Sequence, residues 1–81
     1  MLPIYAVYIL KCSNGQYYTG FTKNMLRRLK EHLTGQVPYT KARRPIVLVH
    51  VSLFEDLQKA YDFERYLKSG SGKAFMKRHL V

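Results

Sequence analysis

Acidic residues are scarce in this chain of 81 residues, which has five Asp and Glu against 14 Lys and Arg and a formal net charge of +9. Such an excess of one sign on a small surface costs self-repulsion and is typical of a protein that binds a polyanion. The alternative is a solvated basic surface that only maintains solubility. Membrane binding is disfavoured, because no segment combines a broad apolar face with a cationic one. We therefore expect a nucleic acid as the partner and no membrane.

Other scarce features exclude further classes of protein. The single Cys12 cannot form a disulfide within the chain, which fits a reducing cytoplasm. The three histidines are scattered without zinc-binding spacing, and there is no phosphate-binding loop or dinucleotide fingerprint. No apolar run approaches the roughly 20 residues that cross a bilayer, and the first residues lack the basic start of a signal peptide. We expect a cytoplasmic protein with one domain over residues 1–81.

Three segments have the composition of β-strands. Residues 4–12 are β-branched and aromatic without helical spacing and predict a buried strand. Residues 16–21 predict a second strand, because an Asn-Gly pair between two such runs favours a hairpin. Residues 46–53 predict a third strand that is apolar on both faces and therefore central or covered by helices. His50 interrupts that run, and we expect it to be a packing residue.

The length of the hairpin loop decides which tyrosines lie together. A two-residue turn at 14–15 places Tyr8 and Tyr18 on opposite faces of the sheet. A three-residue loop at 13–15, with its glycine left-handed, places both tyrosines on one face and Tyr8 opposite Gly20. The sequence leaves both registers open, but only the second makes a joint site from the two tyrosines.

A basic helix is predicted over residues 25–33, with Thr22 or Asn24 as its N-cap. Arg28 and His32 lie one turn apart at the edge of its apolar stripe, where packing can hold a side chain that points into a cleft. The stripe consists of Met25, Leu26, Leu29 and Leu33. The side chains expected to point outward are Arg27, Lys30 and Glu31.

The remaining segments alternate between loops and helices. Residues 35–45 predict a loop that carries Lys41, Arg43 and Arg44. Residues 56–68 predict a helix capped by Asp56, residues 69–72 a short flexible break, and residues 73–80 a final short helix. The apolar stripe of the 56–68 helix consists of Leu57, Ala60, Tyr61, Phe63 and Leu67.

Glu64 lies in the middle of the apolar stripe of the 56–68 helix. Burial of an unpaired carboxylate costs several kcal/mol, so this side chain requires a partner. One alternative is an internal salt bridge with a lysine or arginine. The other is a divalent metal at the floor of a cleft, since Mg²⁺ accepts carboxylate and water ligands.

Tyrosines, an arginine, a histidine and this glutamate suit the cleavage of a phosphodiester. Arg28 can make charge-assisted bonds to a phosphate, and Glu64 can hold a metal that stabilises the transition state. Tyr8 or Tyr18 can act as the general base only if a nearby cation lowers a pKa that is normally near 10. We therefore expect Arg28 and Glu64 to open onto one cleft.

The ordered motifs Ala6-Val7-Tyr8, Tyr18-Thr19-Gly20, Arg28 with His32, and Glu64 resemble the GIY-YIG endonuclease domain. That domain occurs in an excision-repair nuclease, in homing endonucleases and in structure-specific endonucleases. The resemblance covers nearly the whole chain and is greatest to the small stand-alone bacterial members. It implies an α/β (α+β) fold with a three-stranded antiparallel sheet flanked by helices.

The resemblance also implies a hydrolysis of DNA, branched or single-stranded, that uses one Mg²⁺ or Mn²⁺ ion. It assigns Tyr8 and Tyr18 to the site, one of them as base or water-positioning group, and Glu64 to the metal. Arg28 is expected to contact the scissile phosphate, and His32 to assist by hydrogen bonding. Further contacts to the nucleic acid are expected from Lys23, Arg27, Lys41, Arg43, Arg44, Lys73 and Lys77.

The chain departs from the family pattern at several positions. Ala6 replaces the first glycine and Thr19 the isoleucine, and there is no asparagine after Asn24 although some members use one near the site. A non-catalytic nucleic-acid-binding module on the same fold and a nuclease component that needs a partner are the alternative functions. The sequence does not exclude RNA as the ligand.

Overall fold

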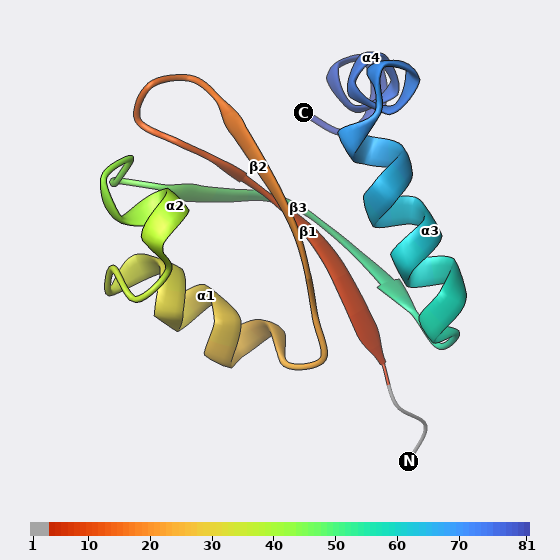
Figure 1. Ribbon diagram of the computed structural model, residues 1–81, viewed down its shortest axis with the longest axis horizontal. Coiled ribbons are helices and arrows are strands. Elements are labelled where there is room, and N and C mark those ends of the chain that lie inside the picture. Colours follow the sequence, from red (N-terminus) through yellow and green to blue (C-terminus); the bar gives the residue numbers. More distant parts are fainter. Residues whose placement is uncertain (1–3) are drawn as a thin grey trace.

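The computed structural model of the protein describes residues 4–81 (Figure 1). Its sheet has three antiparallel strands in the order β2-β1-β3. The strands are β1 (Tyr5–Lys11), β2 (Tyr17–Thr22) and β3 (Val47–Phe54). The residues from Ala6 to Leu10 of β1 are all buried, as expected of a strand covered on both faces. The central strand is therefore β1. Of the two alternatives for the 46–53 strand, the central position is wrong, because β3 is an edge strand, and cover by helices is the one that remains.

The hairpin between β1 and β2 has the three-residue loop. Gly15 adopts the left-handed conformation at φ +84°, and Tyr8 pairs with Gly20. The rings of Tyr8 and Tyr18 lie on one face of the sheet, with centroids 6.3 Å apart. A Cβ atom at Gly20 would collide with the phenol ring of Tyr8. Only glycine therefore allows this ring to lie flat across β2.

Helices cover both faces of the sheet (Figure 1). The helices α1 (Met25–Leu33) and α2 (Pro38–Lys41) lie on one side, and α3 (Leu57–Lys68) and α4 (Gly70–His79) on the other. Successive residues of β1 point to opposite faces, so the two layers have separate cores. The first core consists of Tyr8, Leu10, Cys12 and Ile46, with Met25 and Leu29 packed against it. The second consists of Val7, Ile9, Ala60, Leu67 and Met76.

The buried face of α1 differs from the predicted stripe. Leu26 is 84% exposed and Leu33 is 52% exposed, whereas His32 is fully buried. Met25 and Leu29 do pack on the sheet. The helix is turned so that its inward arc is centred on Met25 and His32, because the polar groups of His32 have partners in the interior. The assignment of Leu26 and Leu33 to the core is wrong.

Two segments predicted to be irregular are helical. The short α2 lies within the predicted 35–45 loop and has Pro38 in its first turn, where the missing N–H costs nothing. The predicted break at 69–72 is the first turn of α4, because Ser69 caps that helix through Gly72 N–H. The N-caps predicted at Asn24 and Asp56 are confirmed. Within residues 4–81, no helix is long and apolar enough to cross a membrane.

Candidate active site

Tyr8 lies at the centre of a buried hydrogen-bond network. Its side chain is fully buried, and its hydroxyl lies 2.8 Å from His32 Nε2. Arg28 Nε donates to the same hydroxyl over 3.3 Å. Burial raises the pKa of Tyr8 to about 12, and this effect outweighs the opposing hydrogen bond from Arg28. The lowered pKa that a Tyr8 base requires is therefore not present in this structure.

His32 is held from both ring nitrogens. Nδ1 lies 2.7 Å from Oγ1 of Thr40, a fully buried residue of α2 whose hydroxyl lies 3.5 Å from the Val37 carbonyl. At the ends of this chain, Arg28 can only donate and the Val37 carbonyl can only accept. All groups are satisfied when Tyr8 donates to Nε2 and Nδ1–H donates to Thr40. This assignment of the hydrogens gives His32 the Nδ1–H tautomer.

The surroundings of His32 favour its neutral form. Burial lowers the pKa of His32, the nearby charge of Arg28 lowers it further, and Glu31 opposes both. A neutral ring suits the network, because Nε2 can then accept the hydroxyl proton of Tyr8.

Arg28 carries the positive charge of the site. Its Nη1 lies 3.1 Å from Glu31 Oε1, and about a third of its side chain is exposed. The prediction that Glu31 points outward is wrong, because Glu31 turns towards Arg28. The hydrogen bond to Tyr8 raises the pKa of Arg28, although burial opposes it. Arg28 is thus a fixed, partly exposed cation that can bind a phosphate.

Tyr18 is the half-buried tyrosine of the pair. Its ring meets His32 edge-on at 5.1 Å and lies 5.3 Å from the ring of Tyr39 in α2. The guanidinium of Arg43 lies 4.0 Å from the centre of the Tyr39 ring. The arrangement leaves Tyr18 more accessible to water than Tyr8, which has no exposed surface.

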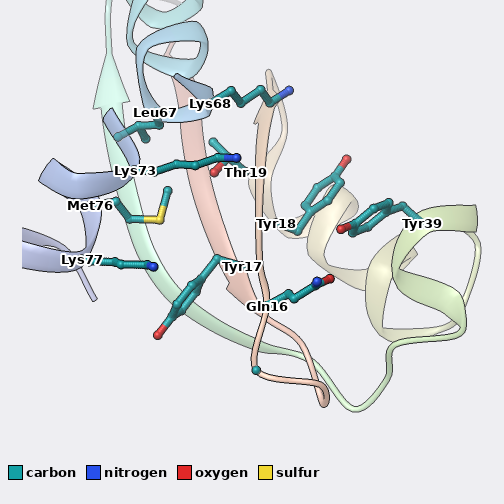
Figure 2. Close-up of a pocket in the computed structure, with 11 residues that line it drawn as sticks. Gln16, Tyr17, Tyr18, Thr19, Tyr39, Leu67, Lys68, Lys73, Met76 and Lys77 are labelled. Carbon is teal, nitrogen blue, oxygen red and sulfur yellow. The ribbon is translucent and has the colours of Figure 1, made fainter. Parts of the chain in front are cut away.

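A groove of about 600 Å³ crosses β2 next to Tyr18. Figure 2 shows Tyr18 and Tyr39 on one side of the strand, Lys73 and Lys77 of α4 on the other, and Lys68 of α3 reaching across the end of the strand. We call it the β2 groove; its lining residues are Gly15, Gln16, Tyr17, Tyr18, Thr19, Tyr39, Leu67, Lys68, Lys73, Met76 and Lys77. Tyr18 thus belongs both to the hydrogen-bonded site and to this groove.

Glu64 of α3 is mostly buried, with 16% of its side chain exposed, and its Oε2 lies 3.2 Å from Lys68 Nζ. The predicted partner is thus present in the form of the salt bridge. Neither Glu64 nor Arg28 lines the β2 groove, so these two residues do not form the expected common cleft themselves. The groove is lined instead by Lys68, the ion-pair partner of Glu64, and by Tyr18.

The residues present can accommodate one divalent cation. Among residues 4–81, no three His, Cys, Asp or Glu side chains gather into a metal-binding cluster. Mg²⁺, however, is usually held by one or two carboxylates and retains water and phosphate oxygens as its other ligands. The competing Lys68 is more than half exposed, so its ammonium group can move into water when a cation takes its place beside Glu64. Glu64 therefore fits as the single protein ligand.

The predicted nucleic-acid contacts lie on different parts of the molecule. Lys73 and Lys77 line the β2 groove, whereas Lys41 and Arg44 line a smaller cavity beside Leu33. Lys23 and Arg27 are exposed near the start of α1. His50 hydrogen-bonds to Ser52 over 2.6 Å in β3.

Sequence analysis did not identify Thr40, Tyr39 or Lys68 as part of the site. Lys68 follows Glu64 by four residues on a helix, and this spacing was a usable signal for an ion pair. Thr40 and Tyr39 lie in α2, within the segment predicted to be a loop, and nothing in the local sequence distinguishes them.

The site is lined by tyrosines, carries the positive charge of Arg28 and lies on a small antiparallel sheet. The family model of the GIY-YIG catalytic domain matches residues 4–79. The chain belongs to the GIY-YIG family, which is a family of nucleases. The predicted α+β fold with a three-stranded antiparallel sheet is confirmed.

Small bacterial proteins of this family are similar to the chain. A UPF0213 protein of Syntrophus aciditrophicus is 43% identical over 67 residues, which cover 80% of this chain and 77% of that protein. The UPF0213 protein lmo0166 of Listeria monocytogenes is 43% identical over 67 residues, with 82% and 74% covered. The solution NMR structure of the UPF0213 protein BH0048 from Bacillus halodurans superposes with a TM-score of 0.61 at 35% identity. That comparison covers 93% of this chain and 83% of the other.

Proposed function

We propose that the protein is a divalent-metal-dependent endonuclease that hydrolyses phosphodiester bonds in DNA, with branched or single-stranded forms as the preferred substrates. The observation that carries this proposal is the arginine of the site. Arg28 is held by Tyr8 through Nε and by Glu31 through Nη1, and 35% of its side chain remains exposed. A cation fixed in this way can bind the scissile phosphate without first losing much conformational freedom.

Glu64 is the residue that would hold the metal, with Mg²⁺ or Mn²⁺ as the expected ion. When bound, such an ion supplies positive charge that stabilises the charged phosphoryl group and the leaving oxygen. The substrate and the ion would release Glu64 from Lys68, and the lysine would then be free to contact a phosphate.

The two tyrosines have different tasks in this proposal. Tyr18 is the accessible hydroxyl and positions the attacking water, which adds across a P–O bond to leave a phosphate monoester and a hydroxyl end. Tyr8 is fully buried with a raised pKa, so it remains a neutral phenol that holds Arg28. His32 and Thr40 orient Tyr8 in turn, which makes them positioning residues.

The test is cleavage of end-labelled single-stranded, duplex and branched DNA, and of RNA, with Mg²⁺, Mn²⁺ or EDTA. We expect Arg28→Gln to lower kcat/KM on the order of 10²-fold. Lys30→Gln removes the same charge from an exposed position of the same helix and should leave the rate nearly unchanged. Equal rates for the two variants would contradict the role of Arg28.

A non-catalytic nucleic-acid-binding module is the second candidate, and the ion pair between Glu64 and Lys68 favours it. If that pair persists when nucleic acid is bound, no carboxylate is available for a metal. The module predicts tight binding with no cleavage under any metal condition, whereas the nuclease predicts metal-dependent cleavage.

A further inference from the structure

The side of the β2 groove formed by α3 and α4 is positively charged. Lys73 and Lys77 are one helical turn apart on α4, so their amines project from the same face. In Figure 2 both side chains extend from α4 towards β2, and Lys68 reaches the same strand from the end of α3. Within residues 4–81, neither Lys73 nor Lys77 forms an ion pair. Both are therefore available to an anionic ligand.

Aromatic rings stand on both sides of the same groove. Tyr17 and Tyr18 are neighbours in β2, and their side chains point to opposite faces of the sheet (Figure 2). Tyr39 adds a third ring beside Tyr18 and is 43% exposed. Partly exposed aromatic rings among lysines are a combination that binds unpaired bases and their backbone.

The groove adjoins the site that contains Arg28, because Tyr18 belongs to both and also influences the pKa of Arg28. Tyr18 lines the groove and also contacts His32, which joins Tyr8 and thereby Arg28. Lys68, at the other side of the groove, contacts Glu64. A strand that places one phosphate at Arg28 can therefore continue across β2 to the lysines of α4.

We propose that the β2 groove binds an unpaired segment of the nucleic-acid strand next to the scissile phosphate, with Lys73 and Lys77 on its phosphates and Tyr17 stacked on a base. Within this proposal, only the cleavage of the phosphate bound at Arg28 rests on the proposed nuclease function. The volume of about 600 Å³ is that of a site for a drug-sized group, so it suits one or two nucleotides rather than a duplex. The preferred substrate is accordingly a strand with an unpaired flank.

The first test is the binding of a labelled single-stranded oligonucleotide in EDTA, where no cleavage occurs, measured by anisotropy over a range of salt concentrations. In Lys73→Gln/Lys77→Gln we expect the affinity to fall about tenfold or more. The slope of log K against log salt should shrink by about 0.7 for each lost phosphate contact, hence by about 1.4. The control variant Lys59→Gln/Arg78→Gln removes two charges from exposed residues outside the groove and should keep the slope.

The second test separates stacking from charge. Tyr17→Leu keeps an apolar side chain against the core, and Tyr17→Phe also keeps the ring. We expect about a tenfold loss of affinity for single strands in Tyr17→Leu and almost none in Tyr17→Phe. Equal affinities for the two variants would remove the stacking role.

The outcomes distinguish this inference from the proposed function. If the lysine variant binds single strands as well as its control, the groove proposal is overturned, whether or not the protein cuts. If the lysine variant loses as much affinity for a blunt duplex as for the single strand, the assignment to unpaired strands is overturned. If the binding pattern holds but the wild type never cuts, only the nuclease proposal fails.

Discussion

At the scale of single residues, Thr40 closes the buried hydrogen-bond chain that begins at Arg28. Thr40→Val keeps the shape of the side chain but leaves His32 Nδ1 without its buried partner. We expect a loss of about 1–3 kcal/mol in the free energy of unfolding, measured in urea. Because Arg28 would be oriented less well, kcat should fall while KM changes little.

Thr40→Ser is the matched control, because it retains the hydroxyl and removes only a methyl group. It should recover most of the kcat that Thr40→Val loses. If both variants have the same kcat, Thr40 contributes packing alone and the positioning role is wrong.

His32 gives the stability a defined pH dependence. Its folded-state pKa lies below the ordinary value of 6.5, so the unfolded chain binds a proton first as the pH falls. The contribution of His32 to stability is therefore fully present above about pH 6.5 and is lost progressively below it. Melting temperatures measured from pH 7.5 to 5 should decline, and His32→Gln should flatten part of that decline.

The exposed His79 provides the control for the pH experiment. His79→Gln should keep the pH dependence of the wild type. A His32→Gln protein with the full decline would mean that other groups cause it.

At the scale of elements, the tight junction between α3 and α4 depends on one glycine. A Cβ atom at Gly72 would collide with the backbone carbonyl of Tyr66, whereas one at Gly70 would meet nothing within 4 Å. We expect Gly72→Ala to lower the free energy of unfolding by about 2 kcal/mol or more, since backbone atoms must move. Gly70→Ala should be neutral or slightly stabilising. Equal urea midpoints for the two variants would contradict this account.

The order of the strands and of the three longer helices along the chain could be predicted from the sequence, and the hairpin register could be reduced to two alternatives. Local signals such as the Asn24 cap act over a few residues and are visible in the sequence. The rotation of α1 could not be predicted, because Leu26 is exposed only when His32 finds Tyr8 and Thr40 in the interior. Four-residue α2 is too short to show a helical period.

The candidate site was predictable as a set of residues but not as a geometry. The order of the tyrosines, Arg28 and His32 along the chain suggested a phosphate-binding site. Their connections depend on tertiary packing: the fold buries Tyr8 completely and leaves Arg28 partly exposed. This packing reverses the pKa shift that a Tyr8 base requires.

At the scale of the whole molecule, the net charge of +9 should make binding to nucleic acid strongly dependent on salt. Each phosphate contact releases condensed counterions and thereby adds about 0.9 to the steepness of log K against log salt for duplex DNA. We expect an approximately linear decrease in affinity between about 50 and 200 mM salt, roughly independent of sequence. A flat response would mean that the basic surface does not bind the phosphate backbone.

The most direct test of the central claim is cleavage by Glu64→Gln beside wild type and Glu55→Gln, which removes one acid from an exposed position instead. The account predicts that the wild type and Glu55→Gln cut DNA with Mg²⁺ or Mn²⁺ and not in EDTA. Glu64→Gln, which frees Lys68 from its ion pair, should bind in EDTA at least as tightly as the wild type but cut more slowly, on the order of 10²-fold. Cleavage by Glu64→Gln at the wild-type rate, or cleavage by the wild type in EDTA, would contradict a metal-dependent site built on Glu64.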